Sequence, residues 1–104
     1  MTLDLSGVHP AHLVPFDESG EEILEDPLRE HLRSLDRMEG IEAMITNGHG
    51  AEVFALSPDE RVRLVEIVSD TLSASSPVVS GLVAGSTMEA TREAGRLADA
   101  GADA

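Results

Sequence analysis

Three short apolar runs alternate with three amphipathic segments along the chain, and this spacing constrains the fold more than any other feature. The runs cover residues 8–15, 41–46 and 77–83, so that their starts are 33 and 36 residues apart. Short β-branched runs bounded by glycine and proline are typical of buried parallel strands. A strand–helix order with this period predicts an α/β domain whose parallel strands are joined by right-handed crossovers.

Capping signals place the helices more firmly than the strands. A serine, a proline and a glutamate in the order of a capping box predict a helix that begins at Pro58. A second capping box, from Ser86 to Glu89, predicts a helix that Gly101 ends. The first helix is expected to run from about Asp26 to Gly40. Residues 100–104 are expected to end the last helix and begin a fourth strand.

The expected helices carry apolar stripes at intervals of three or four residues, the repeat of an amphipathic helix. The stripe of the first helix consists of Leu28, Leu32, Leu35 and Met38. The stripe of the second consists of Val62, Val65, Val68 and Leu72.

The composition excludes several classes of function. The chain has 104 residues, with 20 acidic and 7 basic side chains and a formal net charge of −13, which would repel nucleic acids and anionic membranes. All basic residues are arginine, so no Schiff base can form on a lysine of this chain, and cysteine is absent. No apolar run approaches the roughly 20 residues of a membrane span. We therefore expect a cytoplasmic protein without a metal or cofactor of its own.

The acidic composition raises two further questions, whether the chain is disordered and whether it is adapted to high salt. High charge with only two aromatic residues, Phe16 and Phe54, would fit disorder, but a hydrophobic fraction of 41% and the periodicity favour a folded domain. A lysine-free acidic composition would also suit a salt-adapted protein, because dissolved ions screen the repulsion between like charges. An unfolding midpoint that is unchanged between dilute buffer and molar KCl would contradict salt adaptation.

Four motifs, in order, resemble one enzyme family. Residues 7–17 resemble a first strand of the pattern G-x-x-x-A-L-x-T-P-F-D, and residues 47–52 lie where that family carries the loop G-T-T-G-E. Residues 56–61 resemble the L-[ST]-x-x-E-[RH] that opens its second helix. Residues 81–87 and 100–104 resemble its third strand with the following cap, and the A-G-A-D-A before its fourth strand. From about residue 7 to residue 104, the chain is similar to the dihydrodipicolinate synthase and N-acetylneuraminate lyase family.

The resemblance implies a (β/α)8 TIM barrel that acts on 2-keto acids such as pyruvate through a Schiff base. Such a barrel needs about 250 residues, so residues 1–104 would form a single partial domain, the first three βα units with an incomplete parallel sheet. The family's Schiff-base lysine lies on its sixth strand and its proton-relay tyrosine on its fifth. We therefore expect no catalytic residue in this chain and no activity from it alone. Intact family members are commonly homo-oligomers.

The resemblance also implies that the loop formed by Asn47, Gly48, His49, Gly50 and Glu52 binds the substrate carboxylate. The glycines allow a close approach of the backbone, whose N–H groups can face an anion. His49 could donate a hydrogen bond or move a proton near neutral pH. Here His49 and Gly50 replace the family's two threonines, whereas Glu52 matches. The alternative is a glycine-rich turn in which Glu52 holds backbone amides.

Four other features are better explained by structure than by function. His9 and His12 point to opposite faces of a strand, so we expect one in the core and one against a helix. Residues 81–87 lack the lysine of a phosphate-binding loop, and the acidic residues 17–22 lack calcium-loop spacing. We expect an N-cap and a solvated loop there. We expect three arginines along one edge of the first helix to form surface ion pairs with Glu25 and Glu30. These are Arg29, Arg33 and Arg37.

Two functions from different classes remain open. The first is the N-terminal part of a keto-acid lyase or aldolase, and the alternative is a free-standing acidic α/β binding or interaction module. A flavodoxin-like nucleotide binder fits the strand order but lacks aromatic stacking residues. Because three strands cannot close a barrel, one face of the sheet has no opposing strands, and we expect the isolated chain to be molten or to associate through its open edges, with a seam at Val78 and Val79. That face is expected to include Val8, Ile41, Val78, Val79 and Leu82.

Overall fold

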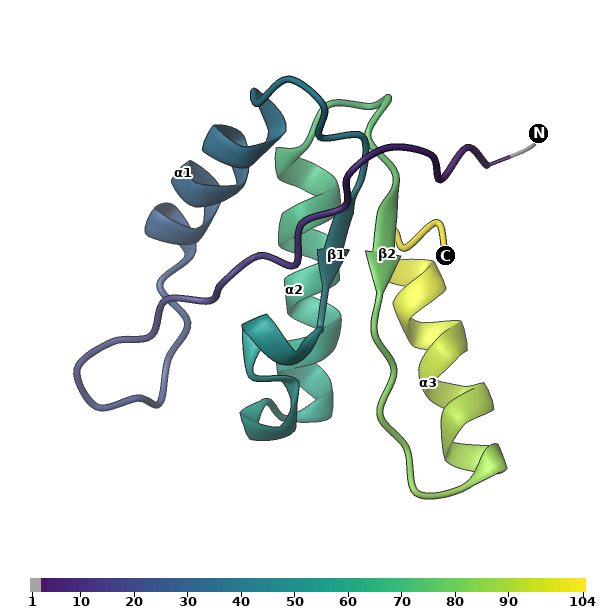
Figure 1. Cartoon of the computed structure of the whole chain (residues 1–104). Helices are drawn as coiled ribbons and strands as arrows, with labels where there is room; N and C mark the ends of the chain where they lie inside the picture. The colour runs from purple at the N-terminus through teal and green to yellow at the C-terminus, as the bar shows by residue number, and fades with distance from the viewer. Residues whose placement is uncertain (1–2) are drawn as a thin grey trace.

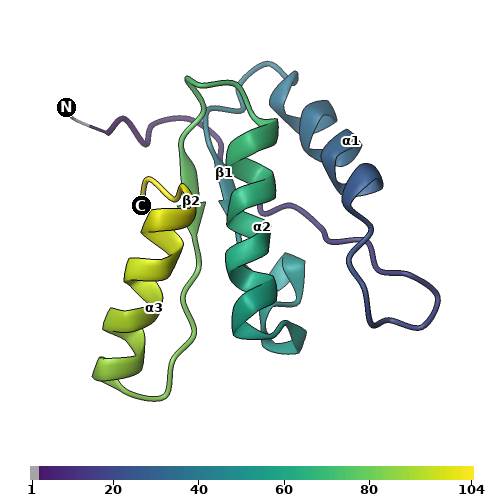
Figure 2. The same cartoon turned by 180° about the vertical axis from the view of Figure 1, so that it is seen from behind.

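A computed structural model describes residues 3–104 and shows helices packed on one side of a small parallel sheet. The element order is α1 (Glu25–Asp36), β1 (Met44–Thr46), the 3-10 turns η1 (His49–Ala51) and η2 (Val53–Ala55), α2 (Pro58–Thr71), β2 (Val78–Ser80) and α3 (Thr87–Ala100). In Figure 1, α2 lies behind β1 and β2, with α1 and α3 flanking it, and Figure 2 shows the same layer from the helix side. The predicted α/β class is confirmed. None of the helices in residues 3–104 has the length and apolarity needed to span a bilayer.

The sheet has two regular strands and two further segments at its edges. β1 and β2 pair in parallel, with Ile45 beside Val79. On one side, residues 8–12 follow β1 through isolated bridges, from Val8 to Ile41 and from Ala11 to Ile45. On the other side, the Ser80 N–H donates to the Ala104 carbonyl at 2.8 Å. Residues 103–104 therefore lie alongside β2, where a fourth strand was expected to begin, but they form no regular strand.

The strands are shorter than the apolar runs that predicted them. Residues 8–15 form isolated bridges rather than a continuous strand, because Pro10 and Pro15 have no N–H group to donate. β2 ends at Ser80, where the chain passes directly against the end of β1. A Cβ atom at Gly81 would overlap the carbonyl oxygen of Asn47, so this close approach requires glycine.

The caps of α2 and α3 differ from each other. Both halves of the predicted capping box at α2 are present, with Ser57 N–H donating to Glu60 at 2.9 Å and Glu60 N–H donating to the Ser57 hydroxyl at 3.1 Å. At α3 the Ser86 hydroxyl accepts from the N–H of Glu89, but the Glu89 carboxylate accepts from the N–H of Gly85 instead of Ser86. The second capping box is thus only half formed.

The ends of the first and last helices also test the sequence signals. Gly101 ends α3 with a φ of +124°, as predicted. α1 ends at Asp36, earlier than expected, and the chain reaches Gly40 through a turn. As a result Met38 lies beyond the helix and is 52% exposed, so its predicted place on the apolar face is wrong.

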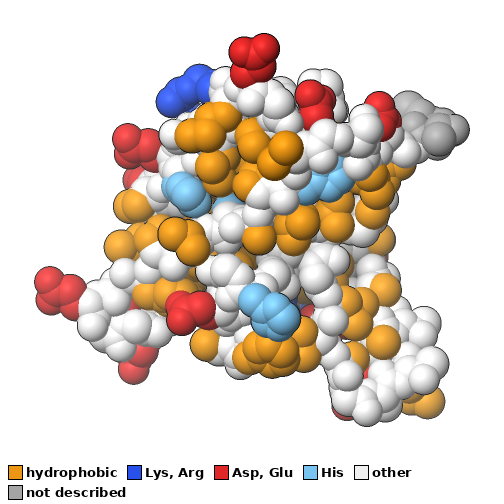
Figure 3. All heavy atoms as spheres, viewed as in Figure 1, with side chains coloured by type: hydrophobic (Ala, Val, Ile, Leu, Met, Phe, Trp, Pro, Cys, Tyr) orange, Lys and Arg blue, Asp and Glu red, His pale blue; other side chains and the backbone are white. Residues whose placement is uncertain are grey.

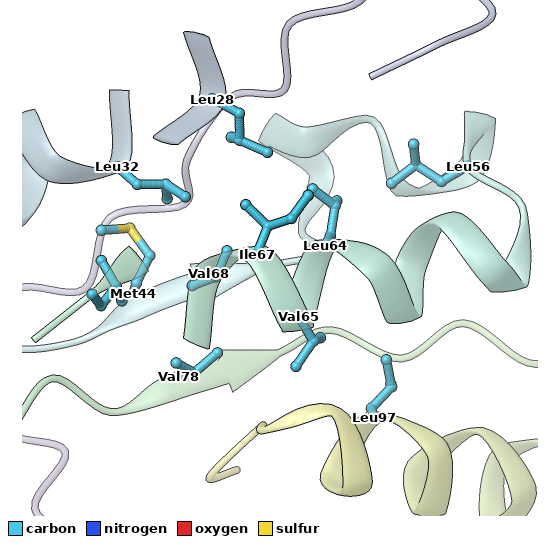
Figure 4. Packing of buried hydrophobic residues seen from close by; sticks show 11 residues of the cluster. Leu28, Leu32, Met44, Leu56, Leu64, Val65, Ile67, Val68, Val78 and Leu97 are labelled. Atoms are coloured by element: carbon cyan, nitrogen blue, oxygen red, sulfur yellow. The ribbon is translucent and has the colours of Figure 1, made fainter. Parts of the chain in front are cut away.

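The core lies between α2 and its neighbours on three sides. Figure 4 shows side chains of α2 pointing toward α1, the strands and α3. The predicted stripe omitted Leu64 and Ile67, which are fully buried beside Val65 and Val68. A single stripe was too narrow because the central helix of a layer contacts two helices as well as the sheet. The other buried members of this core include Leu28, Leu32, Met44, Val78 and Leu97.

The opposite face of the sheet has no helices over it. Met44 and Thr46 are fully buried on the helix side, so strand alternation directs Ile45 and its neighbour Val79 to the other side. In the same way, the buried His12 leaves Leu13 on the uncovered side, where it is 61% exposed. Hydrophobic side chains gather on this face in Figure 3, with acidic groups around its edge. We call this surface the open face.

Two residues expected on the open face lie elsewhere. Val78 is 3% exposed and belongs to the helix-covered core, since consecutive strand residues point to opposite faces. Its carbonyl accepts from the N–H of Asp103 at 2.8 Å, so Val78 offers no free edge for a seam. Leu82 lines a groove of about 170 Å³ beside α3, together with Leu97. The predictions for Val78 and Leu82 are therefore wrong.

Candidate functional site

The predicted binding loop follows β1 directly, at the carboxyl end of the strand. Its η1 turn is closed by N–H groups of Ala51 and Glu52, which donate to the carbonyls of Gly48 and His49 at 3.2 and 2.9 Å. Hydrogen bonds between described residues do not include the N–H groups of Gly48, His49 or Gly50. His49 and Gly50 are exposed and Gly48 is half-buried. The loop therefore carries three successive N–H groups that have no acceptor within residues 3–104.

Asn47 forms the base of this loop and differs from the other predicted site residues in its burial. It is 1% exposed and has a left-handed backbone with φ of +55°, a conformation that asparagine tolerates better than most residues. Its amide nitrogen donates to the carbonyl of Arg61 at 3.0 Å and to the hydroxyl of Ser80 at 3.1 Å. Asn47 thus connects the end of β1 to α2 and β2.

His49 lies on the surface of the loop against an aromatic ring. Its imidazole stacks on Phe54, with ring centroids 5.6 Å apart and an interplanar angle of 23°. Phe54 itself is 70% exposed, so the stack stands at the surface. This contact holds the imidazole against the Phe54 ring. A ring nitrogen of His49 can donate to an anion bound at this loop.

Glu52 lies between η1 and η2 with a left-handed φ of +55°. Its side chain is exposed, and no hydrogen bond to its carboxylate occurs within residues 3–104. The alternative in which Glu52 holds backbone amides is therefore not what the structure shows. Its backbone instead joins the two turns, because its carbonyl accepts from Ala55 N–H at 2.8 Å.

Arg61, which sequence reasoning did not single out, supports the loop from α2. Its Nε donates to the carbonyl of Val53 at 3.3 Å, and its Nη1 pairs with Glu93 of α3 at 3.3 Å. Both side chains of this pair are largely buried, at 13% and 12% exposure. The only sequence signal was the position of Arg61 at the end of the helix-opening motif 56–61.

A buried histidine of the first apolar run lies beneath the loop. His12 is 1% exposed, and its Nε2 lies 2.9 Å from the hydroxyl of Thr46. Its Nδ1 lies 2.9 Å from the Leu13 carbonyl, so a neutral His12 with the proton on Nδ1 accepts from Thr46. Burial lowers the pKa of His12 and the nearby His31 lowers it further, while the hydrogen bond to the Leu13 carbonyl opposes both.

The remaining candidate residues mostly have structural partners. The expectation of a core histidine is confirmed for His12, but His9 contacts the Ser6 carbonyl at 3.2 Å rather than a helix. Ser86 is the N-cap of α3, as expected. The carboxylate of Asp17 accepts hydrogen bonds from its own loop, including the Ser19 hydroxyl at 2.8 Å. Residues 3–104 contain no group of three or more His, Asp or Glu side chains placed to hold a metal ion.

The arginine edge of α1 is only partly paired. Arg29 contacts Asp70 of α2 at 2.7 Å and Glu25 at 3.9 Å. The ion pairs found within residues 3–104 do not include Arg33, Arg37 or Glu30. The prediction of surface ion pairs therefore holds for Arg29 alone.

Comparison with known proteins gives consistent matches along the whole chain. The 4-hydroxy-tetrahydrodipicolinate synthase of Natronomonas pharaonis is 38% identical over 104 residues, which are 99% of this chain and 34% of that protein. The synthase of Methanopyrus kandleri is 35% identical over 104 residues, again covering 34% of its length. This chain therefore spans about a third of the curated relatives that it matches.

Solved structures agree with the sequence relatives. CdNal from Clostridium difficile, solved in complex with mannosamine, superimposes with a TM-score of 0.87 at 30% identity, over 98% of this chain and 35% of that one. A dihydrodipicolinate synthase from Bacillus anthracis has a TM-score of 0.89 at 22% identity over 98% of this chain and 34% of its own, which supports the fold alone. The three βα units thus correspond to the N-terminal part of a TIM barrel. The sequence pattern of the Dihydrodipicolinate synthetase family matches residues 4–104, and the chain belongs to that family.

Proposed function

We propose that residues 47–52 bind the carboxylate of a 2-keto acid such as pyruvate, within a lyase or aldolase barrel to which this chain contributes the first three βα units. The observation that carries this proposal is the set of three successive N–H groups, those of Gly48, His49 and Gly50, left free at the carboxyl end of β1. Consecutive backbone N–H groups in a turn form a concave site for anions. In TIM barrels this edge of the sheet carries the substrate site.

The side chains of the loop divide into two roles in this proposal. His49 adds a donor from its ring, which the stack on Phe54 holds at the surface. Asn47 is buried below and supports the backbone that carries the donors. Glu52 matches the family motif, and its left-handed backbone sets the turn from η1 into η2.

Carbon–carbon bond chemistry requires groups outside these residues. The 104 residues contain no lysine, so the Schiff base of the proposed reaction has to form on a part of a longer protein, or on another chain. Assembly into a homo-oligomer and a cytoplasmic location stay predictions. Salt adaptation also stays a prediction.

The direct test is hydrogen exchange with pyruvate, read by mass spectrometry on a peptide that covers the loop. Pyruvate is expected to slow exchange in residues 47–53, whereas pyruvamide, which lacks the carboxylate charge, is not. His49→Ala is expected to weaken pyruvate protection about tenfold, the loss of one hydrogen bond to a charged group. His9→Ala, away from the loop, is the matched control and should bind as the unchanged chain does.

Two results would contradict this proposal. Equal protection by pyruvate and pyruvamide would show that the loop does not recognise the carboxylate. Absence of protection by either compound would favour the alternative, an acidic interaction module, for which the exposed open face is the supporting observation.

Borohydride added with pyruvate is expected to leave no mass increase on an internal residue, and a specific adduct would contradict the assignment of the Schiff base to residues outside the chain.

A further inference from the structure

Asn47 occupies a more constrained position than any other residue of the loop. Its amide nitrogen has two acceptors, the main-chain carbonyl of Arg61 and the hydroxyl of Ser80. Its amide oxygen is buried and has no hydrogen-bond partner. A buried polar atom without a partner carries a cost in stability. Asparagine at this position therefore implies a compensating contribution from its amide nitrogen and its backbone.

The backbone of Asn47 is fixed as closely as its side chain. The N–H of Gly81 donates to the carbonyl of Thr46 at 2.9 Å, and Gly81 packs against the next carbonyl, that of Asn47. The left-handed φ of Asn47 changes the chain direction immediately before Gly48. The end of β1 is thus held to the end of β2 at two successive residues.

Arg61 connects both ends of the loop to one turn of α2. Its main-chain carbonyl accepts from Asn47, before the loop, while its side chain donates to the carbonyl of Val53, after the loop. The pairing of Arg61 with Glu93 fixes that side chain against α3. Hydrogen bonds to Arg61 therefore fix both ends of the loop between residues 47 and 53.

We propose that Asn47 is a positioning residue, which does not touch the ligand but fixes the direction of the N–H groups of Gly48, His49 and Gly50. The inference rests on the proposed carboxylate site and specifies how that site is kept in shape. Its burial excludes direct contact with a ligand in this conformation. Its two donor bonds hold the base of the loop in place before any ligand arrives, so that the donors need no rearrangement on binding.

The test compares Asn47→Gly, Asn47→Ala and Ser80→Ala in the full chain by hydrogen exchange. Glycine keeps the left-handed backbone but removes the amide and both of its hydrogen bonds. Exchange of the bonded N–H groups of the loop peptide, those of Ala51, Glu52 and Val53, should therefore become roughly tenfold faster or more. Alanine adds backbone strain and should exchange faster still. Ser80→Ala removes one of the two acceptors and should give a smaller increase. The apparent affinity for pyruvate should fall most in Asn47→Ala, less in Asn47→Gly and least in Ser80→Ala.

Two peptides separate positioning from general loss of structure. The peptide that covers α2, residues 58–71, should exchange within about twofold of the unchanged chain in the Ser80→Ala and Asn47→Gly variants. Ser76→Ala, which removes a hydroxyl bound to Asp36 at the opposite end of β2, is the control and should leave the loop unaffected. If Asn47→Gly also loosens α2, Ser80→Ala alone decides the question.

The outcomes distinguish this inference from the proposed function. Faster loop exchange in Asn47→Gly, with no effect of pyruvate on any variant, would support positioning and contradict the carboxylate site. Pyruvate protection that is the same in Asn47→Gly and the unchanged chain would support the site and overturn the positioning role. Unchanged loop exchange in both Asn47→Gly and Ser80→Ala would also overturn it.

Discussion

The two faces of the sheet differ sharply although the same strands form both. On the helix side, Leu64 and Ile67 of α2 belong to the same core cluster as Met44, and all three are fully buried. On the open face, Leu13 is 61% exposed, and Ile45 and Val79 are only half-buried. Strand alternation distributes apolar side chains to both sides, but this chain supplies helices for only one.

This difference shows which part of the barrel the chain can complete by itself. The outer layer of a TIM barrel is made by the helix that follows each strand, so three units bring their own outer cover. The interior is filled by side chains from all the strands together. The open face is therefore the interior of a barrel whose other strands are not in these residues. Stability should reside on the helix side.

The largest expected effect follows from removing a large side chain on each face. Leu64→Ala should lower the free energy of unfolding by about 2–5 kcal/mol, because it leaves a cavity under α2. At a protein concentration too low for association, Leu13→Ala removes the same atoms from an exposed position and should change the free energy of unfolding by no more than about 0.5 kcal/mol. Urea unfolding followed by far-ultraviolet circular dichroism measures both, since the chain has no tryptophan or tyrosine. Equal losses would show that the open face is covered in solution.

A smaller effect is expected from acid, through the buried His12 of the first apolar run. The pKa of the buried His12 lies below its ordinary value of 6.5, so the unfolded chain takes up this proton first as the pH falls. The contribution of His12 to stability is therefore complete above about pH 6.5 and decreases below it. The carboxyl groups with lowered pKa, among them Glu25, lose their contribution only below their ordinary values near 4.

Unfolding free energies measured from pH 7.5 to pH 5 check this prediction. The unchanged chain should lose stability across this range, whereas His12→Leu should show a flatter profile. His9→Leu is the control, since the one hydrogen bond of the His9 side chain within residues 3–104 goes to the Ser6 carbonyl at an exposed site, and its profile should match that of the unchanged chain. A profile for His12→Leu as steep as that of the unchanged chain would assign the acid sensitivity to another group.

The sequence predicted the helices well because their signals are local. Capping serines and the terminal Gly101 act on neighbouring backbone groups, so a short window contains the whole interaction. The face of the sheet to which each strand residue points was harder to predict. Side chains alternate between the two faces, so the assignment of a whole strand depends on knowing which face one of its residues takes. Val78 was assigned to the wrong face for this reason. The number of buried positions on α2 likewise depends on its contacts with α1 and α3, and these contacts cannot be read from a single apolar stripe.

The candidate loop shows the same limit. Its position after a strand and its glycines were visible in the sequence, and the resemblance to the family drew attention to them. The supporting contacts of Asn47 join it to Arg61 and Ser80, which are 14 and 33 residues away. Contacts between residues so far apart in the sequence cannot be predicted from a local sequence pattern. Sequence reasoning therefore found the loop but not the residues that hold it.

The most direct test of the account is sedimentation of the isolated chain over a range of concentrations. If the open face is the uncovered interior of a barrel, the chain should associate as its concentration rises, and Leu13→Asp should shift it toward monomer. Met88→Asp adds the same charge at a site on α3 that is 72% exposed, and it should leave association unchanged. A monodisperse monomer at all concentrations, with sharp methyl resonances and cooperative melting, would contradict the account by showing that three βα units are sufficient.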